Sequence, residues 1–107
     1  MARISITGIR PLTIKLEGPI YFQDSRIIRA KLHSLVRQGH SSFIIDLSEV
    51  DYIDFSGLGV LANMKKKVAA TGGDLLVTGI SGLVETMFQL TKLQEFLCTG
   101  PQRQLQM

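Results

Sequence analysis

The sequence contains one cysteine, Cys98, no tryptophan and only three prolines among its 107 residues. A single cysteine excludes a disulfide within the chain and leaves no cysteine pair for a metal or redox motif. No apolar run approaches the roughly 20 residues that are needed to span a bilayer. The first residues also lack the apolar stretch of a signal peptide. These absences predict a cytoplasmic protein that does not insert into a membrane.

Charge of one sign is not concentrated in any segment. The 12 basic and 9 acidic residues are interleaved along the chain, and the formal net charge is only +3. The densest basic run is Lys65–Lys67, but consecutive helical residues point in different directions around the helix axis. We therefore interpret this run as a solvated helix face, and we expect no direct binding of nucleic acid.

The composition is that of one globular domain. The apolar fraction of 45% and the charged fraction of 20% are ordinary for a folded protein, and no linker, repeat or low-complexity segment divides the chain. A chain of this length usually forms one core. We expect a single domain over residues 1–107.

Apolar patterning predicts at least four strands. Apolar and polar residues alternate over Leu12–Leu16, which is typical of a strand with one buried face, and Ile4 and Ile6 indicate a weaker strand before it. The apolar run Phe43–Leu47 predicts a buried central strand, and Leu75–Val77 predicts another.

Helical spacing predicts three helices. The first is expected to follow Asp24 or Ser25 as the capping residue and to end at Gly39. The second runs from about Ser56 to Thr71, and the third follows Ser81. Their expected apolar stripes are Ile28, Leu32, Leu35 and Val36, then Leu58, Leu61, Met64 and Val68, then Leu83, Val84, Met87 and Leu90.

Two short segments complete the expected order of elements. Gly18–Phe22 is expected to be extended, and so is Phe96–Cys98, before a polar tail beyond Gly100. Strands that alternate with helices at short intervals predict an α/β fold. We expect a small mixed β-sheet packed with α-helices, with a parallel centre and an antiparallel N-terminal edge.

The most informative segment is Asp54–Gly59, between a predicted strand and a predicted helix. Unpaired backbone N–H groups and the positive end of the helix dipole gather at such a position. A serine followed by glycine is sterically open there, so a kinase is able to reach Ser56. The alternative is that Ser56 only caps the helix.

Read together, Phe43–Ser48 and Asp54–Gly59 resemble the signature of STAS domains, the family of bacterial anti-sigma factor antagonists. The resemblance covers roughly residues 10–98. It implies that Ser56 is the phosphorylation site and that Asp54 occupies the family's acidic position. The partner-binding residues that it implies are Asp54, Phe55, Ser56, Gly57, Leu58 and Gly59.

The resemblance also implies a partner switch without enzymatic activity or a cofactor. The unmodified protein would bind an anti-sigma factor that is also a serine kinase, and phosphorylation would end the association until a serine phosphatase restored it. The alternative is an adaptor or regulatory module of a sulfate-type anion transporter or a lipid transport complex. Gly18–Phe22 looks more like the STAS domains of anion transporters.

Two enzymatic interpretations are weaker. Gly57–Ala62 matches a dinucleotide-binding pattern, but Asp74 precedes the next predicted strand, whereas the pattern needs an acidic residue at its end. An acyl-transfer enzyme would need a base near Ser56, but His33 and His40 are on or just after the first predicted helix. We interpret both histidines as bystanders and expect no metal site.

Overall fold

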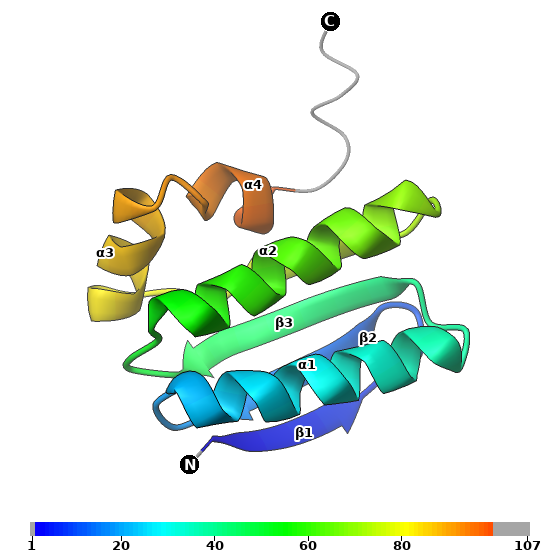
Figure 1. The fold of residues 1–107 in the computed structure, drawn as a ribbon, viewed down its shortest axis with the longest axis horizontal. Coiled ribbons are helices and arrows are strands. Elements are labelled where there is room, and N and C mark those ends of the chain that lie inside the picture. Colours follow the sequence, from blue (N-terminus) through cyan, green and yellow to red (C-terminus); the bar gives the residue numbers. More distant parts are fainter. Residues whose placement is uncertain (1, 100–107) are drawn as a thin grey trace, which may run out of the picture.

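The computed structural model describes residues 2–99 and consists of a four-stranded sheet with helices packed against it (Figure 1). The strands lie in the order β1-β2-β3-β4, with β1 antiparallel to β2 and the other two pairings parallel. The predicted mixed sheet with its antiparallel N-terminal edge is therefore confirmed. The elements are β1 (Arg3–Thr7), β2 (Leu12–Glu17), α1 (Phe22–Arg37), β3 (Ser42–Glu49), α2 (Phe55–Ala70), β4 (Asp74–Thr78), α3 (Gly82–Leu90) and α4 (Gln94–Cys98).

The core lies between the sheet and helices α1 and α2, which run side by side across it (Figure 1). Alternate strand residues face these helices, and the register places Ile14 beside Ile45 and Ile45 beside Val77. All three side chains are buried. Each such aliphatic side chain contributes about 1.5–3 kcal/mol when it is buried. The period-two pattern of the sequence thus determines which face of the sheet packs.

Helix α1 begins earlier than expected, and neither Asp24 nor Ser25 is its capping residue. The N-cap is Tyr21. Its backbone N–H donates at 2.9 Å to Oδ2 of Asp24, which lies in the first turn of the helix. The reason is that Ile20 pairs with another segment, so the extended chain stops at Tyr21 and Phe22 is already helical. The predicted stop is confirmed, because Gly39 follows the helix with φ +103°.

The C-terminal part departs most from expectation. Phe96–Cys98, predicted to be extended, belongs to helix α4, which packs on β4 and α2. In α3 the predicted stripe is only partly right, because Leu83 and Leu90 are 53% and 72% exposed. Phe88, which the sequence reading missed, is fully buried instead. The expected polar tail beyond Gly100 lies outside the described residues.

Lys65 is buried, contrary to its interpretation as part of a solvated run. Only 4% of its surface is exposed, and its Nζ donates to the carbonyl oxygens of Leu75 at 2.9 Å and Thr99 at 3.1 Å. The same ammonium lies 3.1 Å from Asp74 Oδ1 and 5.6 Å from the centre of the Phe96 ring. One cation therefore ties α2 to β4 and to the chain that follows α4.

We predict that Lys65→Met lowers the free energy of unfolding by about 2–3 kcal/mol. The substitution leaves buried carbonyl oxygens without their charged donor, and hydrogen bonds to charged groups contribute about 1.5–3 kcal/mol. Asp74 is partly exposed, so water still solvates its carboxylate. Urea denaturation measures the change, and Lys66→Met is the control. Lys66 is exposed, so its loss is expected to stay within about 0.5 kcal/mol; equal losses would contradict the prediction.

Candidate functional site

The starts of α1 and α2 are held together at one edge of the sheet, beyond the carboxyl ends of β2 and β3. Ile20 and Ile53 form an isolated parallel bridge there. The Ile20 N–H donates to Tyr52 O at 2.8 Å, and the Asp54 N–H donates to Ile20 O at 3.2 Å. Because these bonds join the two segments that lead into the helices, the first turn of α2 is fixed beside that of α1.

Asp54 caps α2. Its backbone is extended (φ −96°, ψ 179°), and its Oδ1 accepts from the Gly57 N–H at 3.1 Å. The same oxygen accepts the hydroxyl proton of Ser56 at 2.6 Å. Ser56 is thus the second residue of the helix, and the alternative that Ser56 itself is the cap is wrong. A negative charge at this position is favourable, because the N-terminal end of a helix carries a partial positive charge.

Gly57 and Leu58 face the interior. This differs from the expectation that both residues belong to the partner-binding surface. A Cβ on Gly57 would lie 2.8 Å from Ile53 Cγ1 and 3.0 Å from Ile20 Cγ2. The Leu58 side chain is 1% exposed and belongs to the core. Gly59 differs, because a Cβ there would meet nothing within 4 Å. Within Asp54–Gly59, the outward residues are therefore Phe55 and, in part, Asp54, Ser56 and Gly59.

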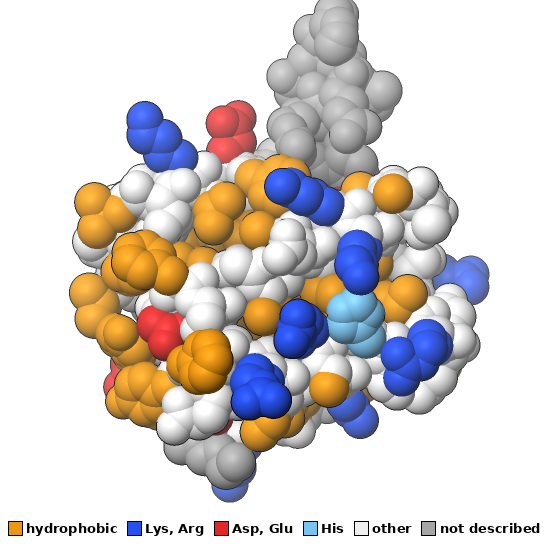
Figure 2. All heavy atoms as spheres, in the orientation of Figure 1, with side chains coloured by type: hydrophobic (Ala, Val, Ile, Leu, Met, Phe, Trp, Pro, Cys, Tyr) orange, Lys and Arg blue, Asp and Glu red, His pale blue; other side chains and the backbone are white. Residues whose placement is uncertain are grey.

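Large apolar side chains surround the first turns of α1 and α2, the corner at which Asp54 and Ser56 lie. Phe22 is 61% exposed at the first residue of α1, and Phe55 is 67% exposed at the first residue of α2. Tyr21 stacks at an angle on Tyr52 with ring centroids 5.4 Å apart. Leu83, at the start of α3, lines a hollow that also includes residues 48–51. We call Tyr21, Phe22, Phe55 and Leu83 the helix-start surface; Figure 2 shows hydrophobic side chains gathered on this left-hand side of the molecule.

The model of the STAS domain family matches residues 3–105. The chain belongs to the STAS domain family. The anti-sigma-B factor antagonist of Bacillus subtilis (strain 168) is 30% identical over 86 residues, which cover 80% of this chain and 78% of that relative. The expected family is thereby confirmed, and this is a family of non-enzymatic regulators.

Solved structures agree with the assignment of the fold. An anti-sigma factor antagonist from Mycobacterium paratuberculosis superposes with a TM-score of 0.81 at 16% identity, over 99% of this chain and 92% of that chain. The Bacillus cell fate determinant SpoIIAA, in its phosphorylated form, superposes with a TM-score of 0.71 at 18% identity, over 99% and 97%. The chain is therefore a single α/β STAS domain with a four-stranded mixed sheet.

The other candidate groups of this STAS domain lie away from the corner. His40 follows the far end of α1, and His33 lies one turn before that end. Partial burial and the neighbouring cations Lys67, Arg29 and Arg37 hold the pKa of His33 below its usual value. Residues 2–99 contain no group of three His, Cys, Asp or Glu side chains that could hold a metal ion. No helix in this part of the chain is long and apolar enough to cross a membrane.

We predict opposite effects of alanine at the two glycines of α2. Gly57→Ala is expected to lower the free energy of unfolding by about 1–3 kcal/mol, because the new methyl group overlaps Ile53 and Ile20. Gly59→Ala is expected to raise it by up to about 1 kcal/mol, because the methyl group meets open space and alanine favours the helix. Chemical denaturation of both variants measures the difference. A similar loss at both positions would contradict this account.

Proposed function

We propose that this STAS domain is an anti-sigma factor antagonist whose binding to its partner is controlled by phosphorylation of Ser56. The observation that carries the proposal is the position of Ser56. Ser56 is partly exposed in the first turn of α2 and follows the exposed Phe55, and its hydroxyl donates to the capping carboxylate of Asp54. The relatives support it, since one is named an anti-sigma-B factor antagonist and another was solved in a phosphorylated form.

The proposed partner is a cytoplasmic anti-sigma factor that also acts as the serine kinase. A serine phosphatase would restore the unmodified state, and neither step requires a cofactor on this chain. The helix-start surface supplies the contact area, because large exposed aromatic side chains such as Phe22 and Phe55 gain most from burial at an interface. Ser56 lies next to Phe55 in the sequence, so a partner that covers this surface would also cover the hydroxyl.

Phosphorylation would act through the bond between Ser56 and Asp54. The modification removes the proton that Ser56 donates to Asp54 and adds about −1.5 to −2 charges beside that carboxylate. In the free protein, water and the helix dipole tolerate this charge, so the fold is expected to survive. At an interface with an effective dielectric constant near 20, like charges about 5 Å apart repel by roughly 3 kcal/mol. This energy corresponds to about a hundredfold weaker binding.

We predict that Ser56 is the principal phosphoacceptor. Ser48 and Ser81 are more exposed and line the neighbouring hollow, but Ser56 follows the exposed Phe55 of the helix-start surface, and its hydroxyl is held by the capping carboxylate of Asp54. Incubation with the cognate kinase and ATP, followed by peptide mapping, identifies the modified residue, and Ser56→Ala is the control. Stable modification of Ser48 or Ser81 with Ser56 untouched would overturn the assignment. Protein from its host that never carries phosphate on Ser56 would instead favour the adaptor role.

We predict that the affinity for the anti-sigma factor follows the charge at this corner. Ser56→Ala is expected to bind like the unmodified protein, Ser56→Asp to bind more weakly, and the phosphoprotein to bind about a hundredfold more weakly. Asp54→Asn keeps a good capping residue but removes the carboxylate charge, so phosphorylation should then weaken binding by only about tenfold. Calorimetric titration measures the affinity of each protein, and Asp54→Asn is titrated before and after phosphorylation. Equal affinity of the phosphorylated and unmodified proteins would rule out the switch.

A further inference from the structure

The outer faces of α1 and α2 carry exposed cations and no exposed acid. In α1 the only acidic residue is Asp24, which is buried and accepts from the Ala2 and Tyr21 N–H groups. Helix α2 has no acidic residue at all. Figure 2 shows Lys and Arg side chains gathered over these two helices around a histidine, with no Asp or Glu side chain among them. We call Arg26, Arg29, His33, Arg37 and Lys67 the basic face.

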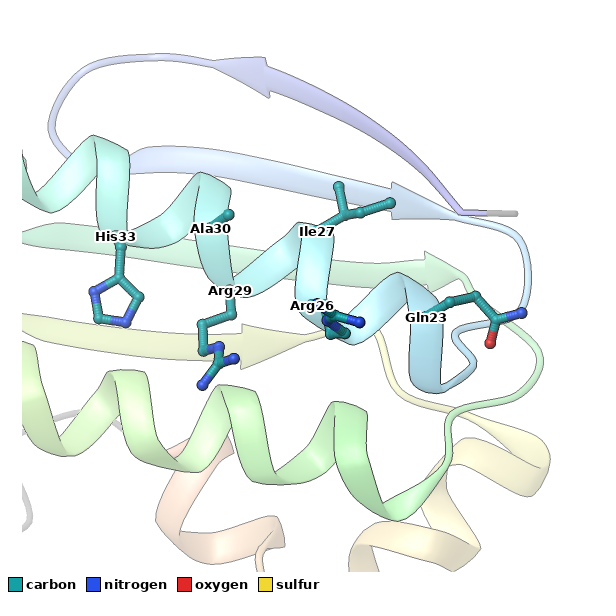
Figure 3. Close-up of a pocket in the computed structure, with 6 residues that line it drawn as sticks. All are labelled: Gln23, Arg26, Ile27, Arg29, Ala30 and His33. Atoms are coloured by element: carbon teal, nitrogen blue, oxygen red, sulfur yellow. The ribbon is translucent and has the colours of Figure 1, made fainter.

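The three arginines of α1 and His33 form one stripe along the helix, and Lys31 lies off this stripe. Arg26, Arg29, His33 and Arg37 follow one another at intervals of three or four residues, which places them on one side of a helix. Figure 3 shows that Arg29 and His33 project from α1 toward α2, whereas Ile27 points away from α2. The first three of the stripe also line a shallow hollow together with Ile27 and Ala30. From the other helix, Lys67 lies close enough to act on His33.

Nothing within residues 2–99 neutralises this face. The ion pairs of these residues are Arg3–Glu17, Lys15–Glu17 and Lys65–Asp74, and none involves the basic face. Like charges three or four residues apart destabilise a helix by a few tenths of a kcal/mol per pair. Burial lowers the pKa of His33 most, and the charges of Lys67, Arg29 and Arg37 lower it further. An acidic partner would remove this repulsion.

We propose that the basic face is the docking surface for an acidic protein segment that extends along α1 from the helix-start surface. The inference rests on the proposed function, because it assigns the segment to the partner that covers Ser56. From Arg26 to Arg37 the stripe spans about 16 Å, the length of about three turns of a partner helix. Carboxylates at matching intervals would pair with its guanidinium groups in the bidentate geometry that arginine favours.

Apolar contacts favour a protein over a nucleic acid. Ile27 is 48% exposed, and it lines the same hollow as Arg26 and Arg29. A phosphate backbone would pair with the cations but leave this side chain uncovered, whereas an amphipathic acidic helix would cover both. The basic face is also continuous with the helix-start surface, since Phe22 begins α1 only one turn before Arg26.

The test compares a double charge reversal on the basic face with a single reversal elsewhere on this chain, and measures the binding of each variant to the cognate anti-sigma factor. Arg26→Glu with Arg29→Glu is expected to weaken binding at least tenfold, and more at low salt than at high salt. Lys92→Glu, an exposed cation in the turn between α3 and α4, is expected to leave binding unchanged. Circular dichroism checks that all variants fold. Unchanged binding of the double variant, or an equal loss for Lys92→Glu, overturns the inference.

A second assay needs no cognate partner and identifies the class of ligand. Its probes are a Glu-rich helical peptide of roughly 16 residues, which is about 24 Å long, the same peptide with Gln in place of Glu, duplex DNA of matched charge, and phosphatidylglycerol vesicles. The Glu-rich peptide is expected to bind most tightly and to raise the pKa of His33, followed by NMR, because its carboxylates offset Lys67, Arg29 and Arg37. Tighter binding of DNA or vesicles overturns the inference.

The two proposals fail separately. If phosphorylation of Ser56 releases the partner while the double reversal has no effect, the phosphorylation switch is supported and docking of an acidic segment on the basic face is ruled out. If the double reversal weakens binding while phosphorylation has no effect, docking on the basic face is supported and the phosphorylation switch is ruled out.

Discussion

The pairing of Ile20 with Ile53 is the contact on which the rest of the site depends. Both side chains are buried, and their backbones join the segments that lead into α1 and α2. Gly57 completes the arrangement, because only a residue without a side chain fits beside the two isoleucines. Phe22 and Phe55 consequently emerge at one edge of the sheet, and Ser56 lies between core and solvent with its hydroxyl fixed by Asp54.

Charge is distributed unevenly around this contact. The capping carboxylate of Asp54 lies at the edge of the sheet, while the exposed cations Arg26, Arg29 and Lys67 lie on the helical layer. A partner that covered both regions would meet an apolar corner that carries Asp54 with Glu49 and Asp51 nearby, and then a positive strip. Modification at the corner would change the charge of only the first region, so a single hydroxyl is able to control a much larger interface.

Several features follow from the sequence alone because they depend on neighbouring residues. The alternation in Leu12–Leu16 and the apolar run Phe43–Leu47 predicted the two inner strands, and short connections through helices predicted their parallel pairing. The segment Asp54–Gly59 was located at a helix start for the same reason, since capping residues and glycines are local signals. The family resemblance rested on these same segments.

Tertiary packing alone decided which side each of these residues faces. Gly57 faces inward beside Ile20, which is more than thirty positions away in the chain, and Leu58 next to it is part of the core. Lys65 was buried because the carbonyl oxygens of Leu75 and Thr99 converge on it. The basic face arises because two helices that are distant in sequence pack side by side. Local patterns carry no information about which distant segment arrives at a given helix face, so these contacts emerge only when the chain is folded.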